Sequence, residues 1–168
     1  MRGYIFRLLL LFVAVLLQYT VLDKLKILEA RLDLTIILTL YFGFKGGIMA
    51  GQTTGFMAGL LEDLIPLKNF GINMLIKTII GFTAGLFHKR IYTDAFLAVF
   101  LIVLAGTFVK GALYILVVQI FIKSMSYAMI EGYFVNTLLI EMLLNALVAP
   151  VLFNLLNKLN LSLAEDSF

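Results

Sequence analysis

Two ionisable residues lie inside apolar stretches of this chain, where a charge is costly. Lys110 lies near the middle of one stretch, and Glu141 lies about a third of the way into the next. A charge at the bilayer centre costs roughly 2.5–3.5 kcal/mol on insertion scales. Both residues lie at similar distances from Tyr127 in the intervening connection, so on antiparallel helices their depths differ by only about 4.5 Å. Either they form an ion pair, or Lys110 finds a carbonyl or water while Glu141 is protonated or lines a cavity.

Two asparagines extend this set. Asn145 follows Glu141 by one helical turn on the same face, and Asn73 lies in an earlier apolar stretch. We therefore expect Lys110, Glu141, Asn73 and Asn145 to form an intramembrane polar cluster, which is either a binding site or, as we favour, a set of interhelical hydrogen bonds that fixes the bundle. Lys77 is closer to the end of its apolar stretch, and we expect it to snorkel to the membrane surface.

No catalytic or metal-binding set is evident. The single histidine, His88, lies at a predicted membrane boundary, so a serine-histidine-acid arrangement is not credible. Glu62 and Asp63 are adjacent carboxylates without metal-ligand spacing, as expected of the acidic end of a helix. The chain has no cysteine, which excludes disulfides, thiolate metal sites and cysteine nucleophiles. We predict no enzymatic activity, no metal and no cofactor.

The elements that carry these residues are predicted to be membrane helices. Hydrophobic residues make up 62% of the 168 residues and charged residues 14%, and a spanning helix needs about 20 predominantly apolar residues. The connections are too short for a second domain, and the net charge of +3 is scattered, which argues against nucleic-acid binding. We predict a single all-α transmembrane domain over residues 1–158, with about six spans near 4–21, 33–44, 47–61, 70–87, 95–122 and 133–156, and a polar tail at 159–168.

The second apolar stretch is short. It covers only some 17 Å, so it either recruits residues before Asp33, thins the bilayer locally, or is re-entrant; we favour a short full span. The turn after it contains Lys45, Gly46 and Gly47. Arg2 and Arg7 before the first span, and the basic cluster that ends the fourth, favour cytoplasmic termini.

Glycines recur at every fourth position in the third stretch. Gly47, Gly51, Gly55 and Gly59 would form one small-residue face of a helix, and in lipid such faces allow close helix contact. The face serves packing within the protein, which we favour, or docks the helix of a partner. The sequence GFTAGL at 81–86 echoes GFMAGL at 55–60, which suggests that two helices pack closely or that a helix was duplicated.

The run YFGFKGGIMAGQTTGFMAGLLEDL, followed by FGINML, resembles the core of the rod shape-determining protein family MreD. The chain also resembles this family at Leu17-Gln18, at Leu32-Asp33-Leu34 and in NALVAPVLFNLLNKL, although Leu32 stands where a proline is frequent. The resemblance covers essentially the whole chain, and the segment 41–75 is its distinctive part. The matching motif residues are Gly55, Phe56, Gly59, Leu60, Asp63 and Gly71.

This resemblance implies a function. Members of the family are multi-span scaffolds in bacterial cell-wall elongation that bind the single-span protein MreC. They help to link MreB filaments to the glycosyltransferase RodA and its transpeptidase, which implies a place in the bacterial inner membrane. The fold of the family also resembles the substrate-binding S component of energy-coupling-factor vitamin transporters, which is the alternative function. Those proteins dock through an Ala-x-x-x-Ala surface in their first helix, whereas the first span here contains only Ala14.

Overall fold

The computed structural model describes residues 2–25, 30–65, 70–90, 95–121, 130 and 132–165. Their regular elements are all helical. The elements are α1 (Arg2–Thr20), the short 3-10 helix η1 (Leu22–Leu25), α2 (Leu34–Asp63), α3 (Ile72–Leu86), α4 (Phe96–Phe121), the π-helix η2 (Tyr133–Leu138) and α6 (Leu139–Glu165).

The apolar length of these helices suits a membrane. Within the described ranges, three segments are long and apolar enough to span one, namely Leu34–Asp63, Phe96–Phe121 and Asn136–Leu159. Two shorter apolar helices are Ile5–Thr20 and Ile72–Leu86. The prediction of an all-helical membrane protein is therefore confirmed. The helix α6 continues to Glu165, beyond the predicted end of the last span at residue 156 and into the segment predicted to be a polar tail. After Pro150, no further proline or glycine interrupts this leucine-rich sequence.

The long element α2 is broken at Gly47. This residue has φ 80° and ψ −171°, which lie outside the helical region and which glycine adopts at little cost. The chain reverses there, since a methyl group added at Gly51 would lie 2.9 Å from the Cα atom of Gly43. In a continuous helix these two positions would be about 12 Å apart. We call residues 34–46 the first arm of α2 and residues 48–63 its second arm.

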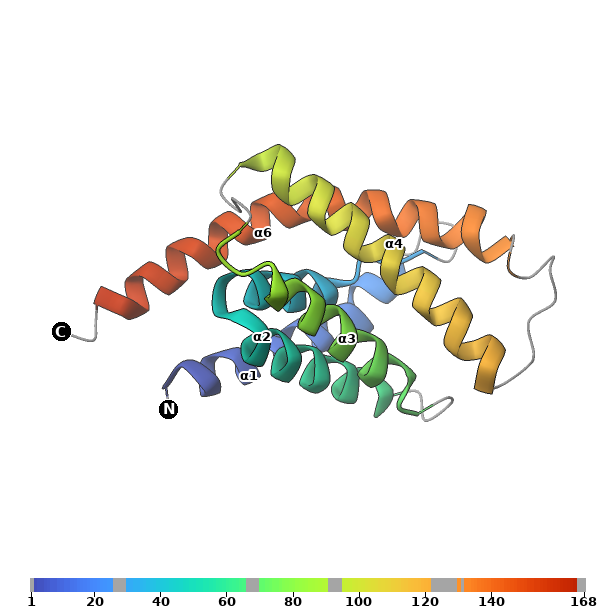
Figure 1. Cartoon of the computed structure of the whole chain (residues 1–168), viewed down its shortest axis with the longest axis horizontal. Helices are drawn as coiled ribbons and strands as arrows, with labels where there is room; N and C mark the ends of the chain where they lie inside the picture. The colour runs from blue at the N-terminus through green and yellow to red at the C-terminus, as the bar shows by residue number, and fades with distance from the viewer. Residues whose placement is uncertain are drawn as a thin grey trace.

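The first arm is the centre of the bundle, and residues 35–44 are all buried. A helix enclosed by protein can be shorter than the bilayer, because neighbouring helices rather than lipid surround it. Figure 1 shows α4 and α6 along one side of the bundle and α1, α2 and α3 along the other, with successive helices running in alternating directions. The first arm contacts Arg7 of α1 through Phe42, Ala84 of α3 through Gly43, Gly106 of α4 through Leu40 and Phe153 of α6 through Tyr41.

Glycines bring the second arm of α2 into direct backbone contact with α3. A methyl group at Gly51 would lie 2.0 Å from the carbonyl oxygen of Gly81, and one at Gly55 would lie 2.1 Å from that of Lys77. A methyl group at Gly59 would lie 2.3 Å from the Cα atom of Met74. The structure therefore assigns these three glycines to packing within the chain, and α3 covers the face that a partner helix would need.

The expectation for Gly47 was wrong. It does not share a helix face with the other three glycines, because it is the residue at which the helix breaks. A methyl group there would meet His88 at 3.7 Å, which is ordinary van der Waals contact. Its positive φ, rather than close packing, is what requires glycine at this position.

The motif residues Asp63 and Gly71 organise the start of α3. The Asp63 carboxylate accepts hydrogen bonds from the backbone N–H groups of Gly71 at 3.0 Å, Asn73 at 3.3 Å and Met74 at 3.0 Å. These are N–H groups that have no hydrogen-bond partner within the helix. The negative charge of Asp63 is also attracted to the partial positive charge at the N-terminus of α3. Gly71 has φ 96°, a left-handed conformation that favours glycine.

The tight contact between α2 and α3 predicts a specific sensitivity. Gly55→Ala places a methyl group against the backbone of α3, which cannot move aside as a side chain can, so we expect a loss of about 1–3 kcal/mol in stability. Thermal unfolding of the detergent-solubilised protein, followed by circular dichroism, measures this. Gly132→Ala is the control, because nothing lies within 4 Å of a methyl group there. Equal melting temperatures for the two variants would contradict the assignment.

Candidate functional site

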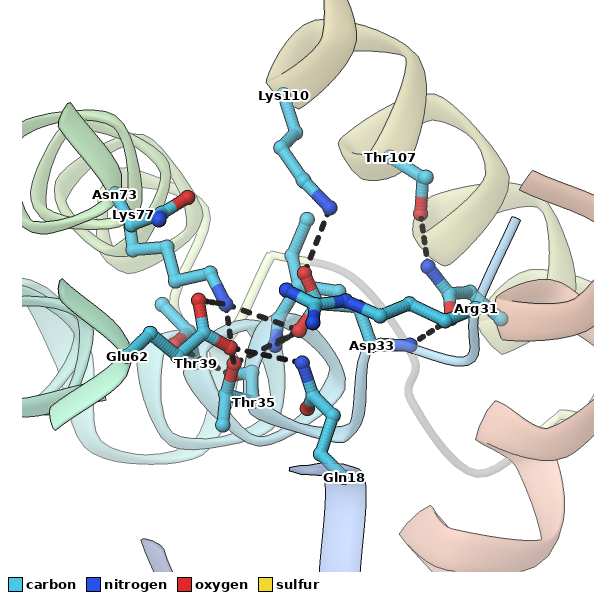
Figure 2. Close-up of polar contacts among 12 residues, drawn as sticks. Gln18, Arg31, Asp33, Thr35, Thr39, Glu62, Asn73, Lys77, Thr107 and Lys110 are labelled. Carbon is cyan, nitrogen blue, oxygen red and sulfur yellow. Dashed lines mark hydrogen bonds and ion pairs between the residues drawn. The ribbon is translucent and has the colours of Figure 1, made fainter. Parts of the chain in front are cut away.

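Asp33 holds two lysines that come from different helices. Its carboxylate lies 3.0 Å from Nζ of Lys77 on α3 and 2.7 Å from Nζ of Lys110 on α4. The same carboxylate accepts a hydrogen bond from the backbone N–H of Ile36 at 3.0 Å, so Asp33 is also the N-cap of α2. Figure 2 shows both lysines directed at Asp33 from two sides.

Glu62, at the end of the second arm, completes the shell around Lys77. Its carboxylate lies 2.6 Å from Nζ of Lys77 and accepts hydrogen bonds from Thr35 at 2.6 Å and from the amide of Gln18 on α1 at 3.0 Å. The Thr35 hydroxyl also contacts Asp33 and Lys77. Because Thr35 begins the first arm and Glu62 ends the second, the reversal at Gly47 is what brings them together.

The helices α4 and α6 close the other side. Lys110 forms an ion pair with Glu141 of α6, and Asn145, one turn further along, accepts a hydrogen bond from the backbone N–H of Asp33 at 2.8 Å. The amide of Asn145 donates to the hydroxyl of Thr107 on α4 at 3.2 Å. A single turn of α6 therefore contacts α4 and the start of α2 together.

Arg31 contributes a third positive charge. Figure 2 shows its side chain extending toward Asp33, and both Asp33 and Glu62 attract its charge electrostatically. The guanidinium also lies 4.7 Å from the ring centroid of Tyr19. We call this set the ionic cluster: Gln18, Arg31, Asp33, Thr35, Glu62, Lys77, Thr107, Lys110, Glu141 and Asn145. Its three carboxylates face three basic groups, so its formal charges balance.

The ionic cluster is enclosed. The side chains of Lys77 and Glu62 are each 1% exposed, whereas that of Lys110 is 15% exposed and is the most accessible of the five charged groups that form the ion pairs. Gln18 lies near the end of α1 and Asp33 at the start of α2, so the cluster lies toward the end of the bundle away from the start of α1. Within the described ranges, no three histidine or acidic side chains are arranged to hold a metal ion.

Three of the four predicted cluster residues meet here. The pairing of Lys110 with Glu141, one of the two options that their depths allowed, is present, and Asn145 lies beside them. Asn73 is elsewhere, because its side-chain amide donates to Asp63 at 2.8 Å at the start of α3.

The expectation for Lys77 was wrong. The residue does not snorkel, because it faces α2 and is 0% exposed. A signal for this was present in the sequence, since Lys77 shares a four-residue register with Gly81 and Gly85, which are on the packing face of α3. Glu62 likewise continues the buried register of Ala50, Thr54 and Ala58.

Two central residues were missed. Asp33 directly precedes a long apolar run, which is the signal of a helix N-cap, but nothing local indicates that it meets two lysines. Gln18 ends the first apolar run, and its contact with Glu62 lies 44 positions away in the chain. Such long-range pairs depend on how the helices pack.

The ionic cluster is suited to fixing helix positions. Removing one partner of a buried ion pair leaves an uncompensated charge in a medium of low dielectric constant, which is strongly destabilising. The cluster joins α1, both arms of α2, α3, α4 and α6, so each helix is fixed relative to the others by directional contacts.

A double-mutant cycle on Lys110 and Glu141 tests this role. Lys110→Met removes the lysine partner of Glu141 and leaves Asp33 with Lys77, and we expect a loss of about 3–5 kcal/mol. Glu141→Gln leaves Lys110 with Asp33, so we expect a smaller loss. The double variant should be less damaging than the sum of the single changes. Thermal unfolding in detergent measures each, with the exposed Lys158→Met as control. Strict additivity would contradict the coupling.

Comparison with known proteins agrees with the helical membrane architecture. The family model described as rod shape-determining protein MreD matches residues 1–159 of the chain. No curated protein and no solved structure matches it. The matched family is one of structural membrane proteins that determine cell shape, and it is not a known enzyme family. Because the match spans α1 through most of α6, this chain belongs to the MreD family of rod shape-determining membrane proteins.

Proposed function

We propose that this chain is a non-enzymatic scaffold of the cell-wall elongation machinery in the bacterial plasma membrane. It binds a single-span, MreC-like protein and helps to couple MreB filaments to peptidoglycan synthesis by RodA and its transpeptidase. The observation that carries this proposal is the family match over residues 1–159. The enclosed ionic cluster supports it, because a scaffold requires fixed helix positions more than it requires an open substrate cavity.

We further propose that the chain crosses the membrane six times with both termini in the cytoplasm. The reversal at Gly47 supports this, since it divides α2 into two antiparallel arms. The alternating helix directions in Figure 1 also support it, and the start of α1 and the end of α6 lie at the same end of the bundle.

The alternative is a substrate-binding subunit of a vitamin transporter. Such a subunit would dock on its energising module through exposed alanines of the first helix. Ala14, the alanine of α1, is 5% exposed and packs into the core. The buried position of Ala14 therefore favours the scaffold.

An exposed motif residue offers a test of partner binding. Phe56 is 41% exposed on the second arm and is not a member of the buried core cluster. We expect Phe56→Ala to reduce co-purification of a co-expressed MreC-like protein about tenfold, as for an aromatic anchor of an interface, with the melting temperature unchanged. Phe82→Ala, at a similarly exposed phenylalanine of α3, is the control. If the wild-type chain retains no MreC-like protein but retains a vitamin, the transporter alternative replaces the scaffold.

The absence of cysteine allows the topology to be tested directly. We expect Lys24→Cys to react with a membrane-impermeant maleimide in intact spheroplasts, and Lys89→Cys to react only after permeabilisation. Lys45→Cys separates the options for α2. If both arms cross the membrane, it reacts only after permeabilisation, whereas in a re-entrant hairpin it stays protected. Labelling of Lys89→Cys in intact spheroplasts would contradict the proposed orientation.

A further inference from the structure

A groove runs between α1 and the second arm of α2 on the outer surface of the bundle. Its volume is about 160 Å³, and its lining comes from both helices: Arg7, Leu8, Leu11, Thr53, Thr54 and Met57. It is separate from the ionic cluster. Because Arg7 lies early in α1, the groove begins near the end of the bundle that carries the start of this helix.

The groove is apolar despite its two threonines. The Thr53 hydroxyl donates to the carbonyl oxygen of Met49 at 2.7 Å, and that of Thr54 donates to Ala50 at 2.6 Å. Both hydroxyls are therefore bonded to their own helix, as is common for threonine in membrane helices. Apart from Arg7, the lining thus offers hydrocarbon to an occupant, which suits an alkyl chain and not a polar solute.

Arg7 provides a positive charge at one end of the groove. Its guanidinium lies near the turn between the two arms, because a methyl group at Gly46 would lie 3.8 Å from a terminal nitrogen of Arg7. The guanidinium also lies 5.0 Å from the ring centroid of the buried Phe42, a cation–π contact that fixes its position. Lys45, exposed in the same turn, adds a second positive charge.

We propose that this groove is a binding site for an anionic phospholipid. One acyl chain lies along Leu8, Leu11 and Met57, and the phosphate lies against Arg7 at the Gly46 turn. The apolar lining matches the chain, and the charge of Arg7 matches the headgroup. The site is independent of the proposed scaffold function, since it requires no protein partner.

Native mass spectrometry of the delipidated full-length chain tests the site. The protein in neutral detergent receives equal amounts of dioleoylphosphatidylglycerol and dioleoylphosphatidylcholine. We expect a preference for the glycerol lipid that falls about fivefold in Arg7→Gln, the effect of one basic residue on anionic lipid. Arg7→Lys should keep the preference. Arg90→Gln, at an exposed basic residue after α3, is the matched control and should also keep it.

Two further measurements distinguish the contribution of the apolar groove to lipid binding from that of the Arg7 charge. Thr53→Phe fills the groove without altering a charge, so it should reduce binding of both lipids, and it remains informative if Arg7→Gln does not fold. Glycerol phosphate should not compete, because it has no chain. The proposal is overturned if Arg7→Gln keeps the preference, if Arg90→Gln loses it equally, or if glycerol phosphate competes. It is also overturned if Thr53→Phe leaves lipid binding intact and instead removes an MreC-like partner.

Discussion

The rest of the bundle depends on the contacts that the carboxylate of Asp33 makes. It caps the first arm of α2, which is the buried centre of the fold, and it binds Lys77 from one side and Lys110 from the other. The helices form two groups, α1 to α3 and α4 with α6, and Asp33 lies where they meet. A charge at this place is favourable because three independent donors, the two lysines and the N-terminus of a helix, neutralise it.

Backbone packing and the ion pairs are coupled. The glycines of the second arm allow α3 to approach until its backbone touches α2, and this approach brings Lys77 within reach of both Asp33 and Glu62. A wider separation would lengthen both ion pairs while leaving their charges buried. Close packing of the helices in lipid therefore stabilises the fold in two ways. It adds dispersion contacts between the helices, and it holds buried charges close enough to form ion pairs.

The sequence predicts the helical class and much of the packing, because these follow from local patterns. The spacing of Gly51, Gly55 and Gly59 predicts a close helix contact, and matched depths allow Lys110 to pair with Glu141. The position of Lys77 near the end of its apolar stretch predicts that it snorkels, whereas its place on the same helix face as Gly81 and Gly85 predicts the burial that the structure shows. The role of Asp33 could not be predicted, since it arises from helices far apart in the chain whose packing no local pattern specifies.

The positions of the charges also bear on how the chain enters the membrane during synthesis. Asp33 and Glu62 lie at the two ends of α2, where a growing chain can keep them in contact with water. Lys77 and Lys110 lie within later helices, where an isolated positive charge would be costly in lipid. Each lysine therefore emerges after a carboxylate that can receive it, and Glu141 arrives last, opposite a lysine that is already held. The order of charges along the chain thus allows cotranslational assembly without an unpaired lysine in the bilayer.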